Sequence, residues 1–163
     1  MDRPHLALLS CLVVATACGG SEPPPAKDFQ MPLKDTTADR CIETANARRG
    51  KKDGEPQKIT VRHLLVKYAN AKRADASVKR TREQACLRAL EAHEKLVQGT
   101  DFSELVKTYS EEPGAASRDG SLGAIERKDV APPFADAAFE LDVNQASEVV
   151  ETDFGFHVIL RTE

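Results

Sequence analysis

The chain has 163 residues, of which 40% are hydrophobic and 30% are charged, and its formal net charge is −3. This composition is typical of one globular domain of ordinary size with some chain left over. The acidic balance excludes the overall positive charge that most nucleic-acid-binding proteins carry, so no nucleic-acid partner is expected. The charge is nevertheless polarised, because residues 48–82 hold twelve basic and three acidic side chains whereas residues 83–163 hold seven and seventeen.

The first residues have the pattern of an export signal. Arg3 precedes an apolar run, residues 6–17, that is too short to span a bilayer as a helix. The run ends in small residues directly before Cys18, as in the lipobox where a bacterial signal peptidase cuts and the cysteine receives lipid. We therefore expect residues 1–17 to be a lipoprotein signal peptide and Cys18 to be lipidated. The alternative is an ordinary secreted protein that is cleaved at Ala15-Thr16-Ala17.

Either interpretation takes the domain out of the cytoplasm. A lipid on Cys18 predicts a location in a bacterial cell envelope, where the chain is anchored to a membrane through its N-terminus and faces the periplasm. Gly19 follows the cysteine, in place of the aspartate that retains some lipoproteins, and this favours the outer membrane.

Residues 18–56 are predicted to be a flexible tether, because they hold Pro23-Pro24-Pro25, scattered charges and few large apolar residues. One short helix is expected between residues 37 and 49. Cleavage removes Cys11 and lipid would occupy Cys18, which leaves Cys41 and Cys86. In an oxidising compartment these two cysteines can form a disulfide. In the other interpretation, Cys86 is a small buried hydrophobic residue and Cys41 is a free thiol.

The tether is followed by a strand and a helix. Residues 59–65 alternate as in a strand with one buried face, with His63 pointing inward beside Val61. Apolar residues at helical spacing predict a helix over residues 80–98, which begins near Thr81 and ends at Gly99.

Two shorter helices and a last strand complete the pattern. Asp101 and Glu104 have the spacing of a capping box in front of a short amphipathic helix, and Pro132 starts a third helix. The segment between them, residues 110–123, is a loop with three glycines and a proline, and residues 156–160 form the last strand. The fold class is therefore α+β, with a small, mainly antiparallel sheet and helices packed against it.

Four motifs, in this order and at this spacing, resemble the parvulin family of peptidyl-prolyl cis/trans isomerases. They are Val61-Arg62-His63-Leu64-Leu65-Val66-Lys67, Gly120-Ser121-Leu122-Gly123, Pro133-Phe134-x-x-Ala137-x-Phe139 and Phe154-Gly155-Phe156-His157-Val158-Ile159. The resemblance covers residues 57–163, the expected catalytic domain. It implies a parvulin-like antiparallel sheet of about four strands surrounded by helices, and catalysis of rotation about the bond that precedes proline.

The resemblance also implies a site. His63 and His157 would form an inward-facing pair, with Glu112 where family members carry Cys or Asp. Rotation about an amide bond needs no net proton transfer, so we expect the histidines to shape the pocket and tune its polarity. The alternative for Glu112 is that its side chain points to solvent. The residues implied to line an apolar pocket for the proline ring are Leu122, Val130, Phe134 and Phe154.

Three basic residues after the first strand match the phosphate-binding cluster of the phosphorylation-directed parvulins. They are Lys67, Lys72 and Arg73. Arginine can hold a phosphate or carboxylate through two hydrogen bonds, and lysine supplies a point charge. The resemblance therefore predicts a preference for an acidic or phosphorylated residue before the proline, although exposed basic loops are usually only solvated.

The leading hypothesis is a monomeric isomerase that assists folding or conformational change of proline-containing envelope proteins. No cofactor and no metal are expected. Its rival is a non-catalytic module that binds proline-containing segments, as a holdase or adaptor, on a parvulin scaffold; the departures at Glu112, Val130 and Ala131 would then signal weak turnover. A third hypothesis, a purely structural lipoprotein, predicts a filled pocket, whereas the small side chains of Val130 and Ala131 indicate an open one.

Overall fold

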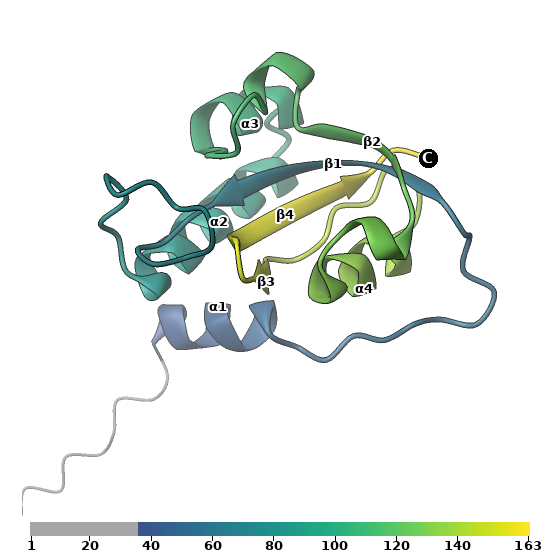
Figure 1. Ribbon diagram of the computed structural model, residues 1–163, viewed down its shortest axis with the longest axis horizontal. Helices are drawn as coiled ribbons and strands as arrows, with labels where there is room; N and C mark the ends of the chain where they lie inside the picture. Colours follow the sequence, from purple (N-terminus) through teal and green to yellow (C-terminus); the bar gives the residue numbers. More distant parts are fainter. Residues whose placement is uncertain (1–35) are drawn as a thin grey trace, which may run out of the picture. The chain divides into compact units, whose positions relative to one another are not determined.

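A computed structural model describes residues 36–163 of the chain. At their centre lies a four-stranded sheet with the strand order β2-β1-β4-β3 (Figure 1). The strands are β1 (Ile59–Val66), β2 (Ser121–Ile125), β3 (Val150–Thr152) and β4 (Gly155–Arg161), and every neighbouring pair is antiparallel. The first and last strands therefore lie side by side in the middle of the sheet, and the predicted α+β fold is confirmed.

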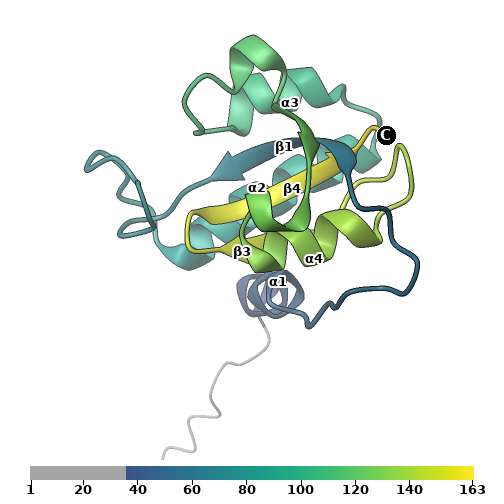
Figure 2. The same cartoon turned by 45° about the vertical axis from the view of Figure 1, so that its right-hand side comes forward.

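Helices cover both faces of this sheet (Figure 2). Leu64 and Val66 of β1 pack with α2 (Arg82–Val97) and α3 (Phe102–Tyr109). Ile59 and Val61, which alternate with them, pack with α4 (Pro132–Glu140) on the other face. The prediction of a strand with one buried face was therefore wrong: Leu64, which falls on the face opposite to His63 in that alternation, is fully buried because α2 and α3 cover that side.

The helices begin where their capping residues indicate. Thr81 caps α2 in a capping box with Gln84, and Asp101 caps α3 by accepting hydrogen bonds from the backbone N–H groups of Ser103 and Glu104. Pro132 occupies the first turn of α4, where its missing N–H has no helical partner to lose. Two short 3₁₀ turns, η1 (Ala116–Arg118) and η2 (Arg127–Asp129), flank β2.

Helix α1 (Thr37–Ala45) belongs to the same compact unit as the sheet. Its Cys41 is buried and is joined by a disulfide to Cys86 of α2, 45 residues further along the chain. At the end of α1, Asn46 Nδ2 donates a hydrogen bond of 2.7 Å to Glu151 Oε2 on β3. The helix is therefore attached both to α2 and to the edge strand of the sheet.

The segment between α1 and β1 is also held against the domain. Arg49 Nε donates to Glu140 Oε1 over 3.1 Å, and both carboxylate oxygens of Glu55 accept hydrogen bonds from Arg127. The flexible tether expected over residues 18–56 therefore does not describe residues 36–56. Polar contacts and the disulfide attach this segment to the domain, although it holds few large apolar residues.

The predicted signal peptide, residues 1–17, and the predicted lipidation site, Cys18, lie outside the residues that the structure describes. Between Thr36 and Glu163, no helix combines the length and the apolar character that crossing a bilayer would require.

Candidate active site

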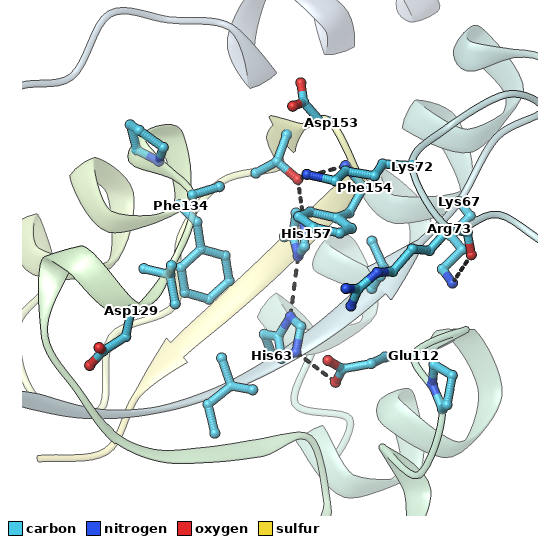
Figure 3. A pocket seen from close by; sticks show the side chains of 17 residues that line it. His63, Lys67, Lys72, Arg73, Glu112, Asp129, Phe134, Asp153, Phe154 and His157 are labelled. Carbon is cyan, nitrogen blue, oxygen red and sulfur yellow. Dashed lines mark hydrogen bonds and ion pairs between the residues drawn. The ribbon is translucent and has the colours of Figure 1, made fainter.

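The site lies on the sheet face that packs against α4, and Phe134 of α4 lines it. In β1 and β4, Leu65 pairs with His157 and His63 pairs with Ile159, so the two histidines are diagonal neighbours on the same face. Their Nδ1 atoms are 3.2 Å apart and both side chains are buried (Figure 3). The register of the two central strands thus brings together two residues that are 94 positions apart in the chain.

The pair belongs to a longer chain of hydrogen bonds. His63 Nε2 is 2.9 Å from Glu112 Oε2, and His157 Nε2 is 2.8 Å from Thr152 Oγ1. With Glu112 ionised and His63 neutral, His63 Nε2–H donates to Glu112, so His63 Nδ1 must accept from His157 and His157 Nε2 from the Thr152 hydroxyl.

Burial lowers the pKa of His157 well below the ordinary value of 6.5, and a positive charge on His63 would act in the same direction. The hydrogen bond from His63 lowers the pKa of Glu112 below its ordinary value against the opposing effect of burial, and Arg118 adds to the lowering. The site therefore combines a fixed carboxylate charge with an uncharged His157. Glu112 points toward His63, not into solvent (Figure 3).

These polar groups form one wall of a cavity of about 700 Å³. The predicted pocket residues Leu122, Val130, Phe134 and Phe154 all line it. Phe134 stands edge-on to both imidazoles, with its ring centroid 5.5 Å from that of His63 and 5.3 Å from that of His157. The cavity is thus apolar around Phe134 and polar along the Glu112 to Thr152 chain.

Two glycines permit the close packing of the histidine strands. Gly120 O accepts the hydrogen bond of His63 N–H over 2.8 Å, and a Cβ atom at Gly120 would lie 2.3 Å from His63 O. A Cβ atom at Gly155 would lie 2.4 Å from Val66 O. Both glycines have positive φ, 74° and 133°, so only glycine meets the steric and the conformational demand at these positions.

The predicted basic cluster is also at the cavity, but its members differ in role. Lys67 is buried, and its Nζ donates to Arg73 O over 2.9 Å, so it fixes the following loop. Lys72 Nζ and Arg73 Cζ lie 5.0 Å and 6.0 Å from the centre of the Phe154 ring. All three residues line the cavity, and only Lys72 and Arg73 have exposed side chains that a bound anion could reach.

Sequence reasoning missed several residues of the cavity. Leu65 could have been found, because it follows His63 by two positions on the same strand face. Thr152, the hydroxyl partner of His157, lies on the three-residue strand β3, which is too short to show a periodicity. Ala131, whose small side chain indicated an open pocket, does line it; the other lining residues that were not predicted as part of the pocket are Pro113, Asp129, Pro132 and Asp153.

Within residues 36–163, no group of three or more His, Cys, Asp or Glu side chains is arranged to hold a metal ion. The arrangement that is present can hold an apolar ring against Phe134 while it presents fixed polar groups to an adjacent amide. These are the demands of a site that rotates a peptide bond before proline.

Comparison with known proteins gives the same class. The family described as the PPIC-type PPIASE domain matches residues 47–163. The chain is 37% identical over 141 residues to a Drosophila melanogaster protein named "Putative peptidyl-prolyl cis-trans isomerase dodo", which covers 82% of this chain and 84% of that protein. It is 33% identical over 135 residues to foldase protein PrsA 4 of Bacillus cereus, which covers 83% of this chain but 39% of the foldase.

A solved structure agrees with these sequence matches. Peptidyl-prolyl isomerase ESS1 from Candida albicans superposes with a TM-score of 0.62 at 30% identity, over 66% of this chain and 63% of that one. The chain therefore belongs to the PPIC-type, or parvulin, family of peptidyl-prolyl cis/trans isomerases, and the predicted enzyme class is confirmed. Residues 47–163 contain all the cavity residues, whereas α1 lies before the matched region.

Proposed function

We propose that this isomerase binds a proline ring against Phe134 and rotates the preceding peptide bond beside the chain formed by Glu112, His63 and His157. The observation that supports this most directly is the position of these hydrogen-bonded residues on the wall of the cavity. The series ends in the carboxylate of Glu112, whose lowered pKa favours the ionised form. Leu122, Val130 and Phe154 would complete the ring-binding surface.

The reaction needs selective binding of a twisted amide. Amide resonance imposes a barrier of about 18–20 kcal/mol, and this resonance is lost when the peptide is perpendicular. An enzyme that binds the twisted form better than either planar form lowers the barrier and needs no bond cleavage. The hydrogen-bonded residues can stabilise the altered charge distribution of the twisted carbonyl without reorganising, because they already bond to one another.

In this proposal the two histidines shape the pocket and tune its polarity. His157 is buried and its pKa is lowered, so it does not supply a positive charge at neutral pH. The hydrogen bond with Thr152 fixes the His157 ring, and the hydrogen bond between His157 and His63 orients the His63 ring. The other nitrogen of His63 bonds to Glu112. The roles of all three residues therefore depend on the geometry of the chain and not on net proton transfer.

We propose further that an acidic or phosphorylated residue is preferred before the proline. Lys72 and Arg73 line the cavity on the side of Phe154, and both are held over its ring by cation–π contacts. A carboxylate or phosphate on the residue before proline would meet these two cations, with Lys67 holding their loop in place.

The cellular role that we propose is assistance to proline-containing proteins of a bacterial envelope, with Cys18 carrying the lipid anchor. The apolar run before Cys18 and the names foldase and chaperone among relatives support this role. Mass spectrometry of the membrane fraction should detect a diacylglyceryl cysteine at position 18. A water-soluble protein that begins with an unmodified Cys18 would remove the anchor from the proposal.

Catalysis is separated from binding by two matched substitutions in α4, assayed by NMR exchange on a panel of X-Pro peptides. Phe134 and Phe139 are both about 3% exposed, but only Phe134 lines the cavity. Phe134→Leu should reduce catalysed exchange by roughly tenfold or more, because one ring contact is lost at the proline site. Phe139→Leu should retain it. A wild-type protein that binds the peptides without accelerating exchange would instead be a binding module.

A further inference from the structure

Arg118 makes a contact that the proposed mechanism has not used. It is the last residue of η1, and its Nη2 donates to Glu112 Oε2, the same oxygen that meets His63. Its Nε donates to Ser121 O over 2.9 Å and its Nη1 to Pro113 O over 3.2 Å. All three nitrogens of the guanidinium are therefore fixed. Nη1 and Nη2 bond to the loop that carries Glu112, and Nε bonds to the first residue of β2.

The residues around Arg118 leave room for its guanidinium but restrict its movement. Gly114 has a positive φ of 75°, and a Cβ atom there would lie 3.1 Å from Arg118 Nη1. Arg118 does not line the cavity, so a substrate in the cavity would meet Glu112 and not the arginine. Its side chain is 38% exposed, and solvent therefore weakens its charge at Glu112 without removing it.

Glutamate needs such support at this position. Its side chain has three rotatable bonds, and holding one rotamer costs entropy unless contacts fix it. His63 alone gives the carboxylate one hydrogen bond, to Oε2. The second hydrogen bond from Arg118 selects the orientation in which Oε2 faces His63 and also favours the ionised form.

We infer that Arg118 is a positioning residue, which holds the Glu112 carboxylate ionised and aimed at His63 and thereby sets the acid limit of isomerase activity. This inference rests on the proposed role of Glu112. Other charged groups line the same cavity, namely Lys67, Lys72, Arg73, Asp129 and Asp153, and Glu111 precedes Glu112 in the sequence. Of these, Glu111 already bonds Arg80 and the Lys67 N–H, and Lys67 already bonds Arg73 O. His157 reaches Glu112 only through His63.

The test compares wild-type protein with Arg118→Ala and Arg118→Lys from about pH 2.5 to 9, because the pKa of Glu112 lies below its ordinary value of 4.5. Two quantities are measured: the 13C shift of the Glu112 carboxyl carbon, and kcat and KM for one X-Pro peptide by NMR exchange. Arg118→Ala should move the Glu112 titration and the acid limb of kcat upward together by about 1 pH unit. KM should stay near the wild-type value, because Arg118 does not line the cavity. Arg118→Lys should restore the acid limb, since it restores the charge, but only part of kcat, since it lacks the planar fork.

Arg48→Ala is the matched control, because Arg48 is exposed, does not line the cavity and is also an arginine. If Arg118→Ala fails to fold, Arg118→Gln gives the same comparison, since its amide can still donate to a carbonyl while the charge is lost. A Glu112 titration that is the same in the charge-removing variant and in wild type would overturn the inference. The carboxyl titration needs no turnover, so it decides the role of Arg118 even if the wild-type protein proves to be a binding module.

Discussion

The Nδ1 atoms of His63 and His157 lie 3.2 Å apart, so one imidazole must donate to the other. Neither ring can therefore take its hydrogen-bond role independently. Glu112 defines one end of the chain as an acceptor, and the Thr152 hydroxyl, which can donate or accept, closes the other end. The tautomer of both rings is thus set from the Glu112 end, and the Thr152 hydroxyl follows as the donor to His157 Nε2.

The first prediction concerns the Thr152 end. Thr152→Val keeps the shape of the side chain but removes the hydroxyl that meets His157 Nε2. His157 Nε2 should lose its hydrogen-bond donor and the ring its fixed orientation, so kcat for X-Pro exchange should fall by roughly tenfold. Thr152→Ser is the control, because it keeps the hydroxyl and should keep most of the activity. Equal rates for the valine variant and wild type, measured by NMR exchange, would show that the hydrogen bond from Thr152 to His157 does not matter for catalysis. His157→Ala, which removes the ring itself, should lower kcat further, by about a hundredfold.

The second prediction is a loss of stability in mild acid. Burial lowers the pKa of His157 below 6.5, so between that value and the folded pKa the unfolded chain binds a proton that the folded chain does not. The free energy of unfolding should therefore fall as the pH drops below about 6.5, by up to about 1.4 kcal/mol per pH unit from this residue. Above about pH 7.5 the residue should contribute no slope.

Urea denaturation at pH 7.5, 6.0 and 5.0 measures this slope. The lowered pKa of Glu112 has its effect below the ordinary carboxyl value of 4.5, so the window from pH 6.5 to 5 reports mainly on His157. His157→Gln should flatten the profile in that window, whatever its effect on stability at pH 7.5. A profile as steep as that of wild type would assign the acid sensitivity to another group.

The sequence predicted the helices well because their signals are local. Thr81, Asp101 and Pro132 start three helices at the positions that their capping chemistry indicates. Strand β3 was missed because three residues cannot show an alternation, and with it Thr152 was missed. The second buried face of β1 was missed because the strand pattern alone does not tell that helices from residues 82–109 will cover it.

The site was predicted only in part, for a related reason. His63, His157 and Phe134 stand in motifs that resemble a family, whereas nothing in the pattern of residues 110–123 pairs Arg118 with Glu112. That pair depends on the turn at Gly114 and on the 3₁₀ helix η1, which fold the loop back on itself. Contacts made by a loop with itself have no periodicity from which they could be predicted.

The third prediction concerns the link between α1 and α2. Protein that begins at Gly19 retains only Cys41 and Cys86, and the structure joins them across 45 positions. The unreduced, denatured protein should therefore react with no thiol reagent; two reactive thiols would contradict the disulfide. Replacing both cysteines by serine should lower the free energy of unfolding by about 4 kcal/mol from loop closure. Because neither cysteine lines the cavity, exchange by the folded variant should be unchanged.

The last prediction concerns the residue before proline. Phosphoserine-Pro, Glu-Pro and Ala-Pro peptides of otherwise identical sequence should be turned over with kcat/KM in that descending order, because Lys72 and Arg73 face the cavity from the loop after β1. Each exposed pairing is worth only about 0.2–1 kcal/mol, so the Glu-Pro advantage over Ala-Pro should be about fivefold at low salt and smaller at high salt. Lys72→Ala combined with Arg73→Ala should equalise the rates for the three peptides and leave exchange of Ala-Pro near the wild-type rate.

The control is Lys79→Ala, which removes a basic side chain from the same loop. Lys72 and Arg73 lie over the Phe154 ring at the cavity, whereas Lys79 does not line the cavity, so the control should preserve the preference. Equal rates for all three peptides in wild-type protein would reduce the loop to a solvated surface. A phosphoserine advantage far above that of glutamate, abolished by the double substitution, would instead identify a site with two hydrogen bonds from Arg73 to phosphate.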